Sequence, residues 1–276
     1  MSSDPPVPRL LDRAELTRPP RHLFLSPHYD DVALSCGGTA LLLAQAGRTP
    51  GVALLFGAEP DPAQPLTPFA LGQHAGWGLS AAAVIAARGA EEAAAAAILG
   101  TRVDFLPFRD AIYRGDWYTS DDLLFADPIA GEAGLADEIV AALGLAGAPD
   151  GETRIYAPLA IGGHVDHRHA AAAGIALARA GWDVLFYEDL PYALRAGTAA
   201  ARFDRLEAPM VEAARLGIGA VWEAKIDAIM CYPSQLATVF RYVEAGASRA
   251  EIEAVLRRYA LAIGDEVPAE RFWRLR

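Results

Sequence analysis

The chain has 276 residues, of which 24 are Lys or Arg and 35 are Asp or Glu, so its formal net charge is −11. With 53% hydrophobic and 21% charged residues, the composition is typical of a globular protein and excludes a disordered or fibrous one. The negative charge argues against nucleic acid or an anionic membrane surface as the main partner.

The sequence also indicates a compartment. Two cysteines, Cys36 and Cys231, are too few for a disulfide framework, which favours a reducing environment. The first twenty residues are polar, Pro-rich and charged, and they lack the apolar stretch of a secretory signal. No segment is long and apolar enough to span a bilayer. We therefore expect a cytoplasmic protein without a membrane span.

Short strands and longer helices are predicted to alternate along residues 21–187. Apolar runs predict buried strands at residues 22–27, 51–56, 102–107, 153–159 and 183–187. Helices are predicted at residues 39–46, 80–99, 121–145 (with an interruption near its start) and 169–180. Residues 60–78, rich in Pro and Gly, are predicted to form a long loop. The rest is predicted to be mainly helical, with a break at Tyr232-Pro233.

This alternation predicts an α/β fold, with a Rossmann-like, mostly parallel sheet, helices on both faces and a helical C-terminal extension. We expect a loose N-terminal segment at residues 1–20 and a single domain at residues 21–276, because no repeat and no clear linker divides the chain. Homo-oligomerisation is left open, since exposed Ala-rich helices suit a subunit interface and a core equally well.

Two polar clusters follow predicted strands, at the ends where open α/β sheets bind ligands. His28-Tyr29-Asp30-Asp31 follows the first strand, and His164-Val165-Asp166-His167 follows the fourth. Two imidazoles and one carboxylate suit Zn²⁺ or another divalent transition metal, and a second carboxylate would serve as a general base. Each cluster alone is equally well explained by helix caps and strand ends. Their shared position at strand ends favours a site.

The two clusters together resemble the motifs of the PIG-L/LmbE-like deacetylase family. The family motif His-Pro-Asp-Asp-Glu stands here as His28-Tyr29-Asp30-Asp31-Val32, and the motif His-Pro-Asp-His stands as His164-Val165-Asp166-His167. Further residues that resemble family segments are Arg88 and Glu91 on the Ala-rich helix and, near the C-terminus, Lys225, Tyr232, Ser234 and Gln235. The resemblance spans about residues 21–240.

The resemblance implies metal-dependent hydrolysis of an N-acetyl group from a small amino-sugar conjugate, typically one containing N-acetylglucosamine, with release of acetate and a free amine. It implies zinc as the cofactor and His28, Asp31 and His167 as its ligands. It also implies that Asp30 is the general base. His164 would stabilise the oxyanion or donate a proton to the leaving amine.

Three positions depart from the family pattern: Tyr29 and Val165 replace Pro, and Val32 replaces Glu. None of these changes removes an implied ligand. The replacement of Glu by Val32 does remove a carboxylate that would hold the metal ligands in place by hydrogen bonds.

Three alternatives stay open. The first is a zinc amidase acting on another amide, such as a thiol conjugate or an antibiotic precursor. The second is a Rossmann-like nucleotide-binding protein, although Gly37-Gly38 does not form the glycine fingerprint of that class. The third is a metal-binding protein without catalysis, which the retention of Asp30 and His164 disfavours.

Around the site, aromatic side chains in two loops are candidates for stacking on a sugar ring or for plain loop anchors: Trp77, Tyr113, Trp117 and Tyr118.

Overall fold

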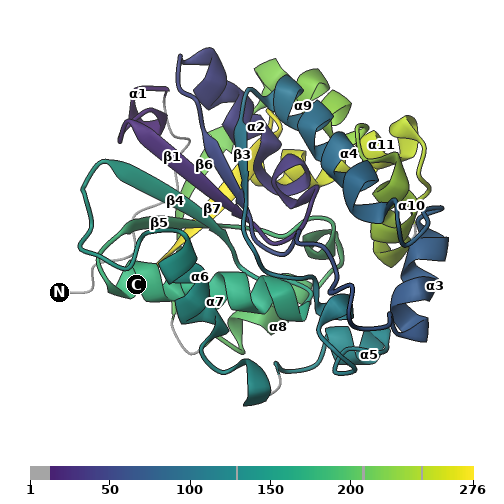
Figure 1. Ribbon diagram of the computed structural model, residues 1–276. Coiled ribbons are helices and arrows are strands. Elements are labelled where there is room, and N and C mark those ends of the chain that lie inside the picture. Colours follow the sequence, from purple (N-terminus) through teal and green to yellow (C-terminus); the bar gives the residue numbers. More distant parts are fainter. Residues whose placement is uncertain (1–12, 129, 207–208, 244) are drawn as a thin grey trace.

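The computed structural model describes residues 13–128, 130–206, 209–243 and 245–276, and within them one sheet lies between two layers of helices (Figure 1). Seven strands form this sheet in the order β3-β2-β1-β4-β5-β7-β6. Strands β1 to β5 pair in parallel, and β7 pairs antiparallel with both β5 and β6. The strands are β1 (Arg21–Ser26), β2 (Gly51–Leu54), β3 (Arg102–Phe105), β4 (Thr153–Pro158), β5 (Asp183–Tyr187), β6 (Met210–Gly217) and β7 (Ala269–Leu275).

Helices cover both faces of the sheet, which confirms the predicted α/β architecture. Helices α2, α4 and α9 pack together on one face, and α6 and α7 pack together on the other (Figure 1). The helices are α1 (Arg13–Leu16), α2 (Asp31–Gln45), α3 (Pro68–Gly76), α4 (Val84–Leu99), α5 (Asp121–Leu124), α6 (Leu135–Ala142), α7 (Val165–Arg179), α8 (Thr198–Phe203), α9 (Trp222–Ile229), α10 (Pro233–Phe240) and α11 (Arg249–Gly264). Short 3₁₀ turns are η1 (Ala111–Tyr113), η2 (Ala130–Glu132), η3 (Tyr192–Leu194), η4 (Gly219–Val221) and η5 (Arg241–Val243). Among the described residues, no helix is both long enough and apolar enough to cross a membrane.

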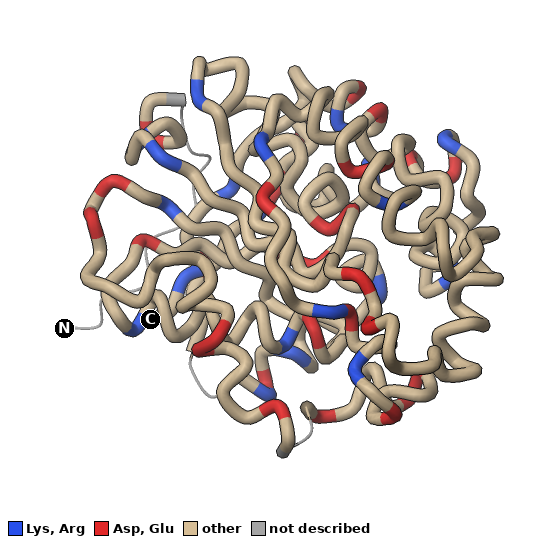
Figure 2. The backbone as a smooth tube through the Cα atoms, viewed as in Figure 1, with Lys and Arg blue, Asp and Glu red and all other residues tan. Residues whose placement is uncertain are grey.

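The central strands are buried on both faces, which explains why they appear in the sequence as apolar runs. Successive side chains of a strand point to opposite faces, so one strand supplies two cores. Leu25 and Ile155 belong to the larger apolar cluster, whereas their neighbours Phe24 and Tyr156 belong to a second cluster. Charged residues of both signs are spread along the surrounding elements (Figure 2).

The start of α2 differs from the prediction. The helix begins at Asp31, so Gly37 and Gly38 lie inside it rather than before it. A Cβ on Gly38 would lie only 2.6 Å from Cγ2 of Ile218 and 2.9 Å from Oε1 of Glu270. The absence of a side chain at Gly38 therefore allows Ile218 and Glu270 to pack closely against α2.

Other predicted boundaries also shift. The predicted loop 60–78 contains α3, which Thr67 caps by accepting a hydrogen bond from the Ala70 N–H. The predicted helix 121–145 consists of α5, η2 and α6, and the region after residue 187 contains β6 and β7 as well as helices. The break at Tyr232-Pro233 is confirmed, because α9 ends at Ile229 and α10 begins at Pro233.

The N-terminal segment set apart at residues 1–20 falls partly outside the described residues, which begin at residue 13. Residues 13–16 form α1, and Leu16 is buried against the second apolar cluster.

The order of the strands creates a crevice beside β1. From β1 the chain proceeds to β2 and β3 on one side, and it later places β4 and β5 on the other side. The loops after β1 and β4 leave neighbouring strands in opposite directions, and such switch points are where open α/β sheets bind ligands. Both polar clusters of the sequence lie at this point.

Candidate metal centre

All five predicted site residues line one cavity of about 90 Å³ at the carboxyl ends of β1, β4 and β5. They are His28, Asp30, Asp31, His164 and His167. The surrounding walls come from α3, α4, η1, α5, η3, α10 and η5, through Gln73, Trp77, Arg88, Asp110, Ile112, Asp121, Leu124, Leu190, Pro191, Tyr192, Gln235, Thr238, Val239 and Tyr242.

Three side chains converge in the way that a metal ion requires. One carboxylate oxygen of Asp31, Oδ2, lies 3.5 Å from His28 Nδ1 and 3.4 Å from His167 Nε2. Ring nitrogens of His28, His164 and His167 also lie within 4.8 Å of one another. Two imidazoles and a carboxylate around one point are a donor set that divalent zinc accepts. The residues present therefore fit a transition-metal ion.

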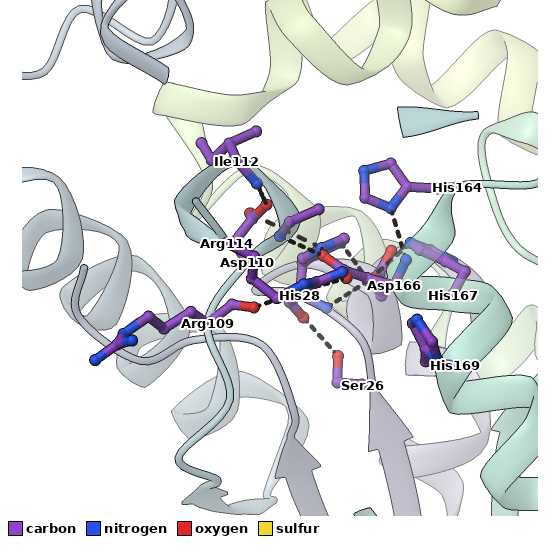
Figure 3. Close-up of polar contacts among 12 residues, drawn as sticks. Ser26, His28, Arg109, Asp110, Ile112, Arg114, His164, Asp166, His167 and His169 are labelled. Carbon is purple, nitrogen blue, oxygen red and sulfur yellow. Dashed lines mark hydrogen bonds and ion pairs between the residues drawn. The ribbon is translucent and has the colours of Figure 1, made fainter. Parts of the chain in front are cut away.

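The outward-facing nitrogen of each proposed histidine ligand is bonded to a buried carboxylate. His28 Nε2 lies 2.9 Å from Asp166 Oδ2 (Figure 3), and His167 Nδ1 lies 2.7 Å from Asp189 Oδ1. With the ring proton donated to the carboxylate, the nitrogen that faces Asp31 carries the lone pair. This carboxylate–histidine arrangement fixes ring orientation in metal sites.

Arg114 keeps Asp166 ionised. Its NH1 lies 2.6 Å from Asp166 Oδ1, and the Ala111 N–H donates to Oδ2 at 3.0 Å. Burial opposes the charge, but Arg114 and His28 outweigh it and hold the pKa of Asp166 well below its usual value. Arg114 is itself bonded to Glu132, which places a further carboxylate behind the guanidinium.

Sequence reasoning assigned no role to Asp166, Asp189 or Arg114. Asp189 lies two residues after the end of β5, at the same edge of the sheet as the two clusters, and this position is the available signal. Asp166 lies inside the second motif. No sequence signal separates Arg114 from the other charged residues of its loop.

Asp30 lies in the cavity in an unusual backbone conformation. Its φ is +92°, a region that residues with a side chain rarely adopt. Burial, together with the adjacent Asp31 carboxylate, raises the pKa of Asp30 well above its usual value. A carboxylate with a raised pKa is a stronger base and is better suited to accepting a proton from water.

His164 caps the N-terminus of α7 and is held as a neutral ring. Its Nδ1 accepts a hydrogen bond from the Asp166 N–H at 3.2 Å, so the ring proton resides on Nε2. Burial is the main cause that lowers the pKa of His164 well below its usual value. His164 therefore offers one N–H donor at the cavity.

The departures from the family motif have local explanations. Tyr29 is buried, and its hydroxyl donates to the Gly57 carbonyl at 2.8 Å, which anchors the loop after β1 through a side chain. Val32 packs in the second apolar cluster with Phe24 and Cys36. A carboxylate at position 32 would lie in that apolar cluster, whereas Asp166 and Asp189 provide the carboxylates behind the two histidines.

One wall of the cavity carries a buried cation. Arg88 is 6% exposed, and its guanidinium lies 4.7 Å from the centre of the Tyr29 ring and 5.0 Å from that of Trp77. Its NH1 is 4.0 Å from Asp110 Oδ2, and its Nε has no hydrogen-bond partner among the described residues.

Of the four aromatic residues considered for stacking on a sugar, Trp77 lines the cavity. Tyr113 is bonded to His74 and Tyr118 to Glu132, and both rings are buried in a satellite cluster. Trp117 is 42% exposed.

The chain is similar to several known proteins. The family model described as PIG-L, GlcNAc-PI de-N-acetylase, matches residues 23–178. The chain is 36% identical to 2'-N-acetylparomamine deacetylase of Streptomyces fradiae over 234 residues, which cover 80% of this chain and 75% of that protein. It is 32% identical to the enzyme of the same name from Niallia circulans over 185 residues, which cover 62% and 66%.

Solved structures show the same fold. The zinc-inhibited form of teicoplanin deacetylase Orf2 superposes with a TM-score of 0.72 at 25% identity, covering 93% of this chain and 98% of that one. The family model spans more than half of the chain, and the Streptomyces relative covers most of it. The chain therefore belongs to the PIG-L family of zinc-dependent de-N-acetylases.

Proposed function

We propose that this chain is a zinc-dependent hydrolase that removes the acetyl group from an N-acetylated amino sugar of the aminoglycoside type. One observation carries the proposal: Asp31 Oδ2 lies between His28 Nδ1 and His167 Nε2, with a second carboxylate, Asp30, in the same cavity. The two curated relatives named for 2'-N-acetylparomamine support the choice of substrate class.

In this proposal His28, Asp31 and His167 hold Zn²⁺. When bound, the ion would supply Lewis acidity, which lowers the pKa of a bound water to about 7. The carboxylates of Asp166 and Asp189 keep the two imidazoles in the tautomer that can donate a lone pair.

Asp30 is the proposed general base. Its carboxylate lines the cavity and its pKa is raised by burial and by Asp31, which suits it to take the proton of the attacking water and then pass a proton to the departing amine. General-base assistance of this kind is typically worth about 10²–10⁴-fold in rate.

His164 is the proposed donor to the carbonyl oxygen of the scissile amide. Because its Nδ1 accepts from the Asp166 backbone, its Nε2–H is free to donate as negative charge develops on that oxygen. The lowered pKa of His164 keeps the ring neutral, so it stabilises the charge by a hydrogen bond rather than as a cation.

The sugar would lie against the wall formed by Arg88, Asp110 and Trp77. The guanidinium of Arg88 lines the cavity as a donor for a hydroxyl oxygen, and Asp110 is an acceptor for a hydroxyl proton. The indole ring of Trp77 provides an apolar surface for the pyranose.

The experiment measures bound zinc per chain and acetate release from 2'-N-acetylparomamine. The wild type is expected to bind zinc and release acetate. Asp31→Ala and His167→Ala are expected to lose zinc, whereas Asp30→Ala keeps zinc and loses most of the activity.

Zinc loss in Asp30→Ala would show that the roles of the two aspartates are exchanged. A wild type that binds no zinc after zinc is supplied would refute the proposed centre. Zinc binding together with acetate release only from a glycopeptide, the substrate class of the teicoplanin relative, would refute the proposed substrate class but not the chemistry.

A further inference from the structure

The proposed general base is held in a strained conformation by groups outside the two motifs. Asp30 has φ +92° and ψ −30°, although it carries a side chain. Such conformations are costly, and they persist where surrounding contacts hold them.

The carbonyl side of Asp30 is held by the first turn of α2, because the Leu34 N–H donates to the Asp30 oxygen at 2.9 Å. The amide side is held from another helix. The Asp30 N–H donates to Oε2 of Glu92, on α4, at 3.3 Å. Both ends of the residue are thus fixed, one within its own helix and one by a distant side chain.

Glu92 is in turn held by α10. The hydroxyl of Tyr232, the residue that precedes α10, donates to the same oxygen, Oε2, at 2.8 Å. Glu92 is 5% exposed and Tyr232 is 1% exposed, so water does not compete easily for this acceptor. The chain of bonds runs from Tyr232 through Glu92 to the Asp30 peptide.

We propose that Glu92, supported by Tyr232, is a positioning residue that keeps Asp30 at positive φ and so aims its carboxylate into the cavity. This inference rests on the proposed role of Asp30. The free energy gained from a hydrogen bond to a carboxylate is similar in magnitude to the strain energy of one residue at positive φ. Loss of the bond therefore lets the Asp30 backbone relax, which moves the carboxylate away from the water it acts on.

The adjacent Glu91 provides a matched control. It also joins α4 to α10, through its bonds to the Ser234 N–H at 2.9 Å and to the Ser234 hydroxyl at 2.6 Å. A substitution of Glu91 therefore weakens the same helix contact without removing the partner of the Asp30 N–H.

The test compares Glu92→Ala, Glu92→Gln, Tyr232→Phe and Glu91→Ala. We measure kcat and KM for acetate release, the zinc affinity, and the Asp30 φ angle in crystal structures of wild type and Glu92→Ala. Glu92→Ala is expected to lower kcat by about 10–100-fold, with KM and zinc affinity close to those of wild type. Glu92→Gln keeps an acceptor oxygen and is expected to recover most of kcat, and Tyr232→Phe falls between the two.

In the Glu92→Ala crystal, Asp30 is expected to move to negative φ. Retention of positive φ there, or a loss of kcat in Glu91→Ala as large as in Glu92→Ala, would overturn the inference. If the wild type released no acetate from any N-acetylated amine, the proposed function would fail by itself. The φ angle would still decide whether Glu92 positions Asp30.

Discussion

Replacing Asp189 by alanine is expected to weaken zinc binding by about 10–100-fold, or about 1.4–2.7 kcal/mol. The Asp189 carboxylate accepts two hydrogen bonds, from His167 Nδ1 at 2.7 Å and from the Ile161 N–H at 2.9 Å. Only the first bond orients a proposed zinc ligand. Its loss frees the His167 ring to turn and removes the acceptor that fixes its tautomer.

The second bond has a separate consequence. Asp189 is 1% exposed, so alanine leaves the Ile161 N–H buried without its acceptor. Such a group costs about 1–3 kcal/mol, and the metal-free protein is expected to lose that much of its free energy of unfolding. The substitution is therefore expected to lower the zinc affinity and the free energy of unfolding by similar amounts, and separate assays measure the two effects.

Zinc affinity is measured by competition with a chromophoric chelator, and stability is measured by urea unfolding of the metal-free protein. Glu188→Gln is the control, because Glu188 is equally buried but accepts from Tyr259 and Arg271. A zinc affinity of Asp189→Ala within about twofold of wild type, or an equal loss in Glu188→Gln, would refute the role given to Asp189.

Three further outcomes are expected. Arg88→Ala is expected to raise KM by about tenfold, with zinc affinity unchanged, because a donor to the substrate is lost; an unchanged KM in steady-state assays contradicts this. Burial lowers the pKa of His22 to about 4, whereas the unfolded chain has a value of about 6.5, so protonation favours unfolding as the pH falls from 6.5 towards 4. In urea unfolding, His22→Phe is therefore expected to gain up to about 3 kcal/mol relative to wild type between pH 7 and pH 4, and a difference that does not vary with pH excludes this explanation. Lys225→Met is expected to cost about 3–5 kcal/mol in the same assay, because it leaves the Glu270 carboxylate buried without its cation; a loss below 1 kcal/mol would show that the backbone N–H donors to Glu270 suffice.

The sequence predicts the parts of the fold that repeat a simple pattern. The four inner parallel strands, β1, β2, β4 and β5, are mostly buried, so each appears as an apolar run, and the polar clusters that follow two of them identify the site edge. The parallel strand at the sheet edge, β3, is mostly exposed. The sequence analysis does not predict strand β7, because three charged residues, Glu270, Arg271 and Arg274, interrupt its apolar pattern. Helix α3 was missed because its Gly and Pro content outweighed the capping signal at Thr67.

The site itself was predictable only where its residues belong to motifs. His28 and His164 are separated by more than a hundred residues, and their proximity depends on which strands neighbour each other. The partners behind them are harder to predict. Asp189 becomes a partner of His167 because β5 lies next to β4, and Glu92 contacts Asp30 because α4 packs beside α2. Such pairs arise from tertiary packing, which a single sequence does not encode locally.

The reacting groups of the cavity and part of its outer wall come from different parts of the chain. The proposed ligands and acid–base groups follow β1 and β4, whereas part of the outer wall comes from α3 and from the segment of α10 and η5, through residues such as Gln73, Thr238 and Tyr242. Variation confined to these three positions leaves the reacting groups and their supporting carboxylates intact. An enzyme built in this way can come to accept different N-acetylated substrates by exchange of surface segments, and a small combinatorial library at these three positions is a direct route to altered substrate specificity.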